Sequence, residues 1–209
     1  RDKLEAFTDR GLETDVAIGL ETATDRVRHD AINKYFDFAD FEAACEEVLS
    51  ATSSTSPEAE AGVKAYLLLK PPFLSESEAI DDAIESIRRC GQVDGVHTIS
   101  LNPTNVHRYT MVEQLYFEGG YRPPWLWSIL EVLRETAEED VTVVSDPVGS
   151  GSDRGPHNCK TCDDRVRTAI EDFNLRQDPS VFTQVACECE DTWQAVCERE
   201  TSYSTPLAR

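Results

Sequence analysis

Residues 63–101 read VKAYLLLKPPFLSESEAIDDAIESIRRCGQVDGVHTISL. The apolar run at 63–69 is typical of a buried strand, and two prolines end it. Ser75 and Glu78 then have the spacing of a capping box, and isoleucines and alanines follow at helical intervals. A second apolar run begins at Val96. The stretch therefore predicts a strand, a helix and a second strand, parallel to the first and joined to it by a right-handed crossover.

The sequence on either side continues the same alternation. An apolar run at 15–20 and a helical pattern at 41–49 come before it. A helical pattern at 110–117, another behind two further prolines, and an apolar run at 141–144 come after it. Strands that alternate with helices predict an α/β fold with a parallel sheet. We expect residues 1–145 to form an open or incomplete barrel, because so few units cannot close an eight-stranded one.

The charged residues are strongly biased. The chain carries 40 acidic against 20 basic residues, a formal charge of −20, and only five of the basic residues are lysines. An acidic, lysine-poor surface is typical of proteins from a salt-loving cytoplasm, and an ordinary acidic protein is the alternative. At about 1 M salt the Debye length is only about 3 Å. The charge therefore removes long-range steering without excluding a nucleic-acid partner.

No targeting or membrane segment stands out in the sequence. No apolar run approaches the roughly 20 residues that cross a bilayer, and the first residues lack the pattern of a signal peptide. We therefore expect a cytoplasmic protein with no membrane contact. The first residue is Arg1, and the residues after it read as the end of a helix, so we expect a piece of a longer protein.

The composition changes at Asp146, where a segment rich in glycine and proline begins. We expect residues 146–209 to form a small cysteine-rich domain. It contains two pairs of cysteines that are close together in the sequence, Cys159 with Cys162 and Cys187 with Cys189. Two such pairs suit a tetrahedral metal ion and predict a structural zinc site, with Cys197 and His157 as alternative ligands. Free or redox-active thiols and an iron–sulfur cluster are the other interpretations.

Polar residues follow the predicted strands, where a parallel sheet places its functional groups. Glu21, Lys70, Asn102 and Asn105 come at or just after the ends of three apolar runs. A carboxylate at such a position suits ribose hydroxyls, and amides suit the edge of a base. The alternative is that each of them is a loop residue or a helix cap.

Several segments together resemble a known family. They are DVAIGLET (15–22), AINKYF (31–36), VKAYLLLKPPFLSESEAI (63–80), ISLNPTNVHRYTMVEQL (99–115), YRPPWLWSILEVL (121–133) and RGPHNCKTCD (154–163). From about Asp15 to Trp193 the chain is similar to the archaeal radical SAM proteins of archaeosine biosynthesis, which are relatives of the elongator-type radical SAM enzymes.

The resemblance implies that residues 1–145 are the last three strand and helix units of a partial (β/α)6 radical SAM barrel, followed by the cysteine-rich domain at 146–209. Such enzymes reduce S-adenosylmethionine at a [4Fe-4S] cluster to obtain a 5′-deoxyadenosyl radical. The implied reaction is a lyase step that cleaves a lysine adduct on the 7-deazaguanine at position 15 of tRNA. The implied partners are tRNA, in its D-arm region, and the archaeosine synthase partner subunit that attaches the lysine.

The resemblance also implies roles for individual residues. The cofactor-binding residues would be Glu21, Lys34, Leu69, Lys70 and Pro71, and the residues facing the substrate base would be Asn102 and Asn105. Among these, Glu21 would contact the ribose or methionine part of the cofactor, and Lys34 the methionine carboxylate. The backbone of 69–71 would pack on the adenine.

The cluster ligands of the family are three cysteines spaced four and then three residues apart, and no such triplet occurs in these 209 residues. We therefore expect the [4Fe-4S] ligands to lie outside this chain, which alone would generate no radical. Two other interpretations stay open. One is another elongator-type radical SAM enzyme that modifies tRNA, and the other is a zinc-stabilised tRNA- or protein-binding module without a cluster.

Overall fold

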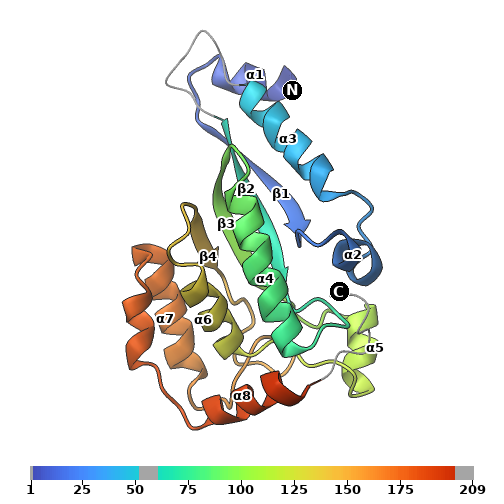
Figure 1. The fold of residues 1–209 in the computed structure, drawn as a ribbon, viewed down its shortest axis with the longest axis vertical. Helices are drawn as coiled ribbons and strands as arrows, with labels where there is room; N and C mark the ends of the chain where they lie inside the picture. The colour runs from blue at the N-terminus through green and yellow to red at the C-terminus, as the bar shows by residue number, and fades with distance from the viewer. Residues whose placement is uncertain (1, 52–60, 201–209) are drawn as a thin grey trace.

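The computed structural model describes residues 2–51 and 61–200, and its centre is a parallel sheet (Figure 1). In the described part of the chain the sheet has four strands in the order β1-β2-β3-β4. The strands are β1 (Thr14–Glu21), β2 (Ala61–Leu69), β3 (Val96–Pro103) and β4 (Thr142–Ser145). Each predicted apolar run coincides with one of them, so the predicted α/β fold with parallel strands is confirmed.

Helices lie before β1, between successive strands and after β4. They are α1 (Asp2–Thr8), α2 (Asp25–Val27), the π-helix η1 (Arg28–Ile32), α3 (Phe38–Ser50), α4 (Glu76–Gly91), α5 (Met111–Phe117), α6 (Leu126–Glu135), α7 (Asp163–Arg176), the 3-10 helix η2 (Pro179–Gln184) and α8 (Cys189–Arg199). The predicted capping box begins α4: Ser75 Oγ accepts from the Glu78 N–H at 3.3 Å, and Glu78 Oε2 accepts from the Ser75 N–H at 2.9 Å. The capping box thereby satisfies two of the backbone donors at this helix end.

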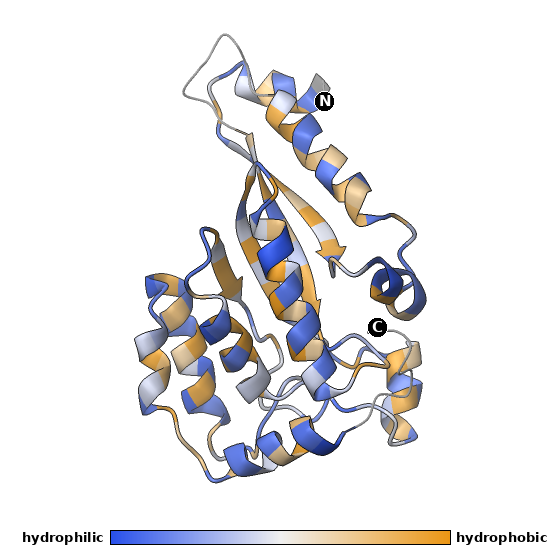
Figure 2. Ribbon diagram, in the orientation of Figure 1, coloured by the Kyte–Doolittle hydropathy of each residue, from blue (hydrophilic) through white to orange (hydrophobic). Residues whose placement is uncertain are grey.

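The helices cover one face of the sheet. Along β2 buried and half-buried residues alternate, with Val63 and Leu67 buried and Lys64 and Tyr66 half-buried. Because neighbouring side chains in a strand point to opposite faces, the buried set faces α3 and α4. In Figure 2 hydrophobic residues run along the strands, whereas the helices alternate between hydrophobic and hydrophilic residues. The other face of β2 is accordingly more polar.

The C-terminal part packs at the β4 edge of the sheet, opposite the edge that β1 forms. Helix α7 contacts α6 and β4, and α8 contacts α4 (Figure 1). The buried side chains of Phe173, Phe182 and Trp193 join the same hydrophobic core as those of the sheet. The predicted boundary between 145 and 146 stays a prediction, and residues 201–209 of the predicted domain lie outside the described residues. Within the described ranges no helix combines the length and apolar composition of a membrane span.

The strand register brings the carboxyl ends of the strands together. Glu21 pairs with Leu67, Leu69 pairs with Pro103, and Leu101 pairs with Ser145. Parallel strands in such a register end at one common edge, and loops that follow them converge there. This edge is called the strand-end edge below.

Candidate functional site

The end of β1 carries an ion pair between two of the predicted site residues. Lys34 Nζ donates to Glu21 Oε1 at 2.5 Å and to the carbonyl oxygen of Gly19 at 2.7 Å. The side chains of Glu21 and Lys34 are 21% and 37% exposed, so a ligand at the strand-end edge has access to both. A Cβ on Gly19 would lie 2.9 Å from Lys34 Nζ. The glycine is therefore what lets the ammonium group approach the strand.

A buried arginine shapes the loop that carries Lys34. Arg28 is completely buried, and its guanidinium donates to the carbonyl oxygens of Thr22 at 2.5 Å and Phe36 at 2.8 Å and pairs with Asp25. The N–H of Lys34 in turn donates to the Arg28 carbonyl oxygen at 3.1 Å. A buried guanidinium must satisfy its donors, so the loop is wrapped around it. Sequence reasoning missed Arg28, because nothing in the spacing distinguishes it from a surface arginine.

The residues at the end of β2 are buried and internally bonded. The Leu69 carbonyl oxygen accepts from the N–H and the hydroxyl of Thr104 at 3.0 and 2.8 Å. The Lys70 carbonyl oxygen accepts from the Tyr121 hydroxyl at 2.8 Å, and the ammonium group of Lys70 donates to Glu76 Oε2 at 2.6 Å. Pro71 is also buried. The predicted packing of this backbone on an adenine stays a prediction. The side chain of Lys70 is paired with Glu76.

The two predicted amides lie at the end of β3 and beyond it. Asn102 is half-buried and donates from Nδ2 to the carbonyl oxygen of Ser100 at 3.0 Å. Asn105 is also half-buried, and a Cβ on Gly155 would lie 2.8 Å from its Oδ1. The glycine-rich segment thus folds closely over Asn105. Both amides are near the strand-end edge, but their predicted contact with a substrate base stays a prediction.

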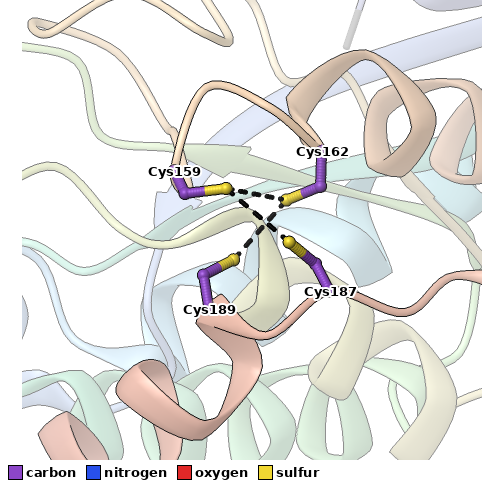
Figure 3. A group of neighbouring side chains, drawn as sticks. All are labelled: Cys159, Cys162, Cys187 and Cys189. Atoms are coloured by element: carbon purple, nitrogen blue, oxygen red, sulfur yellow. Dashed lines mark hydrogen bonds between the residues drawn. The ribbon is translucent and has the colours of Figure 1, made fainter.

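Four thiol groups meet where α7 and α8 begin (Figure 3). The sulfur atoms of Cys159 and Cys162 are 3.8 Å apart, those of Cys159 and Cys187 3.7 Å, and those of Cys162 and Cys189 3.6 Å. All four lie within 4.8 Å of one another. With zinc–sulfur bonds of about 2.3 Å, a tetrahedral site has sulfur atoms about 3.8 Å apart. The cluster therefore has the size that one tetrahedral ion requires.

The same distances argue against a disulfide and against an iron–sulfur cubane, whereas the interpretation as free thiols stays open. A disulfide needs sulfur atoms about 2.05 Å apart, and all four thiols are free. An iron–sulfur cubane holds its four thiolates further apart, because irons and sulfides lie between them. The group of four ligand atoms includes neither His157 nor Cys197. The structure thus gathers the four cysteines that the spacing singled out.

The surroundings of the thiols supply hydrogen-bond donors. The Trp127 indole donates to Cys189 Sγ at 3.3 Å, and Asn158 Nδ2 donates to Cys162 Sγ at 3.5 Å. Burial opposes ionisation of Cys159, but backbone N–H groups of the turn and neighbouring thiols lower its pKa to about 6. Burial raises the pKa of Cys162 and of Cys189. A bound dication would favour the thiolate form of all of them.

A buried network connects the cysteine cluster with the end of β2. Glu76 Oε1 accepts from the Ser128 hydroxyl at 2.5 Å, and the Trp193 indole of α8 donates to Ser128 Oγ at 2.9 Å. The other carboxylate oxygen of Glu76 binds Lys70. Glu200, just beyond α8, accepts from the Glu76 N–H at 2.6 Å. Helix α8 is thus held by the cluster at its start and by the Glu76 network at its end.

Sequence reasoning missed most of these supporting residues. Trp127 and Asn158 lie in the conspicuous segments YRPPWLW and RGPHNC, which was the available signal. Glu76 lies in the first turn of α4 and reads as an ordinary helix-start acid. Its role depends on contacts with α6 and α8, which are distant in the sequence.

Comparison with known proteins places the chain among archaeal relatives. Archaeosine synthase subunit beta of Methanosarcina acetivorans is 45% identical over 196 residues, which are 92% of this chain and 54% of that protein. The protein of the same name from Thermococcus kodakarensis is 45% identical over 201 residues, 95% of this chain and 58% of that protein. An uncharacterized protein of Methanocaldococcus jannaschii is 35% identical over 211 residues. The chain thus spans little more than half the length of these curated relatives.

A solved structure shares the fold. Elp3 of Methanocaldococcus infernus, with residues 1–46 deleted, superposes with a TM-score of 0.57 over 90% of this chain and 40% of that one. The sequences are 11% identical, so this likeness concerns the fold alone. No protein-family model matches the chain.

Proposed function

Because this chain is a homologue of archaeosine synthase subunit beta over most of its length, we propose that it is part of a radical SAM lyase that completes archaeosine in tRNA. The lyase step cleaves the lysine adduct on the 7-deazaguanine at position 15, after a partner subunit has attached the lysine. The 45% identity over 196 residues carries the proposal, and the fold shared with Elp3 agrees with it. The chain spans 54% of that relative, so the proposed activity is that of the complete barrel.

The polar groups at the end of β1 fit S-adenosylmethionine. The ligand has a carboxylate, an ammonium group and a ribose diol, which call for one cation and one anion side by side. Lys34 and Glu21 supply this pair 2.5 Å apart and partly exposed. We assign Lys34 to the carboxylate of the ligand and Glu21 to its ammonium or ribose groups. When bound at an iron–sulfur cluster, the ligand is the source of the radical.

The described residues do not fit the iron–sulfur cluster itself. The sequence lacks the family's cysteine triplet, and the four clustered thiols are too close together for a cubane. The proposal therefore takes the [4Fe-4S] ligands from outside this chain and derives no step from them. Asn102 and Asn105 are proposed to face the modified base from the strand-end edge.

We propose zinc for the four cysteines. Four thiolates leave zinc no open position, so the ion would be structural and would not meet substrate. Its site joins the turn before α7 to the start of α8, and α8 then reaches the Glu76 network at the end of β2. In this way the ion would hold the C-terminal helices against the barrel strands.

The lyase proposal is tested by disrupting the gene in the organism that carries it and analysing tRNA nucleosides by mass spectrometry. We expect archaeosine to disappear and the lysine adduct to accumulate. Restoring the gene should reverse both changes, whereas Glu21→Gln and Lys34→Met versions should not. A Glu13→Gln version is the matched control, because Glu13 is an exposed acid just before β1, at its other end.

The possible results are clearly separated. Unchanged archaeosine after disruption would contradict the proposed function. Loss of archaeosine without the adduct would place the protein at another step. Full activity of both the Glu21→Gln and the Lys34→Met proteins would contradict the assigned cofactor contacts while leaving the reaction in place.

A further inference from the structure

Helix α5 and the residue before its cap expose an unusual set of side chains. None of the seven residues of α5 is buried. Tyr109 is 96% exposed, Phe117 70% and Met111 58%. Three of the eight large hydrophobic side chains that are exposed in the described residues thus fall within residues 109–117, and a concentration of this kind is typical of a binding surface. We call Tyr109, Met111 and Phe117 the α5 surface.

The backbone presents the Tyr109 ring to solvent. Tyr109 has φ 67°, in the left-handed region that residues other than glycine seldom adopt. Its N–H donates to Glu113 Oε2 at 2.8 Å, and the other carboxylate oxygen of Glu113 accepts from Arg154 at 2.5 Å. The hydrogen bond from Arg154 lowers the pKa of Glu113, which therefore stays ionised. The ring is thus held exposed by a backbone conformation that residues other than glycine seldom adopt.

The charge around the α5 surface differs from that of the whole chain. Residues 101–130 carry Arg108 and Arg122 against Glu113 and Glu118, which gives zero net charge in a chain of −20. Arg154 adds a guanidinium 5.8 Å from the centre of the Phe117 ring. A polyanion is therefore repelled less at this surface than the overall charge of −20 suggests.

The α5 surface adjoins the strand-end edge. Helix α5 follows β3 and lies at the end of the molecule toward which β1 and β2 point (Figure 1). Arg154, which holds Glu113, also donates to the Val106 carbonyl oxygen at 2.9 Å, next to Asn105. The surface and the amide proposed to face the modified base are thus fixed to the same loop.

We propose that the α5 surface binds unpaired nucleotides of the tRNA by stacking their bases on Tyr109 and Phe117. This inference rests on the proposed function and adds the place where the RNA is held. Stacking on aromatic rings needs no long-range attraction and tolerates high salt, which suits an acidic protein. A stable protein partner would need about 800 Å² on each side, more than a seven-residue helix offers, so a few bases fit better.

The test uses the complete protein that contains these 209 residues and three RNA probes: an archaeal tRNA transcript, a short single-stranded oligoribonucleotide and a blunt RNA duplex. Affinities are measured by fluorescence anisotropy in about 2 M KCl, where phosphate contacts are screened. We expect Tyr109→Ala/Phe117→Ala to weaken binding of the tRNA and the single strand by about tenfold or more. Phe117→Trp, which keeps a stacking ring, should bind like the wild type. Leu175→Ala is the matched control, because Leu175 is exposed and apolar but lies on α7.

Each result has one consequence. Equal affinities of the double variant and Leu175→Ala would overturn the stacking surface and leave the proposed function intact. A complete wild-type protein that binds no tRNA would contradict the tRNA substrate and the stacking surface together. Equal losses for the duplex and the single strand would show that paired RNA or phosphate is recognised, which also overturns the inference.

Discussion

Asn158 Oδ1 accepts a hydrogen bond from the backbone N–H of Leu126 at 2.9 Å and thereby caps the start of α6. The same oxygen lies 3.3 Å from the N–H of Trp127, and the amide nitrogen of Asn158 donates to Cys162 Sγ. One buried side chain therefore ties the cysteine turn to a helix that begins some thirty residues earlier. This contact links the two unusual segments, YRPPWLW and RGPHNC, in space.

Replacing Asn158 should loosen both sides of this contact. We expect Asn158→Ala to lower the free energy of unfolding by about 2 kcal/mol or more, because it removes a helix cap and leaves buried N–H groups unpaired. Urea unfolding of the metal-loaded chain measures it. Thr168→Ala removes an exposed hydroxyl on α7 and should change stability by less than about 0.5 kcal/mol. Equal stabilities of the two variants would refute the capping role.

The cysteine cluster predicts a metal content. The purified chain should carry about one zinc ion, and chelation should lower its melting temperature, because the ion joins the start of α8 to the turn before α7. Cys162→Ser should lose most of the zinc. Cys197→Ser should keep it, since Cys197 is a thiol outside the cluster. Metal analysis by mass spectrometry checks the content, and a Cys162→Ser protein with full zinc would contradict the site.

Removing one partner of the buried ion pair of Lys70 and Glu76 should destabilise the fold more than removing both. Both side chains are almost completely buried, so Lys70→Met leaves the Glu76 carboxylate without its counter-ion. The expected loss is about 3 to 5 kcal/mol of unfolding free energy, and Lys70→Met/Glu76→Gln should recover part of it. The exposed pair of Arg167 and Glu171 is the control.

Arg167→Ala should cost less than about 1 kcal/mol, because water screens that pair. Urea unfolding curves of all variants at one pH give the comparison. If Lys70→Met were no more destabilising than Arg167→Ala, the Glu76 carboxylate would not depend on its buried partner.

Gly19 predicts a binding defect without an unfolding defect. A Cβ there would meet the flexible ends of Lys34 and Glu21 and no backbone atom, so Gly19→Ala should change stability by less than about 1 kcal/mol. The displaced pair should bind S-adenosylmethionine about tenfold more weakly in the complete protein. Equilibrium dialysis measures the affinity. Ala17→Ser, at an exposed position of the same strand, is the control, and equal affinities would argue against ligand binding at this pair.

The charge of −20 predicts a strong salt dependence. The Debye length falls from about 8 Å at physiological ionic strength to about 3 Å at 1 M, so added salt should relieve the repulsion among the carboxylates. We expect the melting temperature to rise from about 0.15 M to about 2 M KCl. Differential scanning calorimetry measures it, and a melting temperature that falls over this range would contradict adaptation to salt.

Features that depend on near neighbours in the sequence were predictable. The apolar runs, the capping box of Ser75 and Glu78, and the CxxC and CxC pairs each involve residues within a few positions of one another. Strand and helix periodicity follows from local geometry, and short loops bring paired thiols together by themselves. The predicted strands and the clustered cysteines are therefore confirmed.

Contacts between distant residues could not be predicted from spacing. Trp193 and Ser128 are 65 positions apart, and Asn158 and Leu126 are 32 apart. Arg28 and Glu76 carry no sequence pattern that separates them from surface residues, although each is buried with several partners.

Periodicity and cysteine spacing along the chain were enough to specify parallel strands, covering helices and a four-thiol cluster, because each follows from residues close together in sequence. Only the folded chain shows that Lys34 rests on Gly19 beside Glu21, that Lys70 turns to Glu76, and that Tyr109 faces solvent. The direction of a polar side chain is set by whichever donors, acceptors and charges the packing of distant segments brings within reach, and that packing is a property of the whole fold.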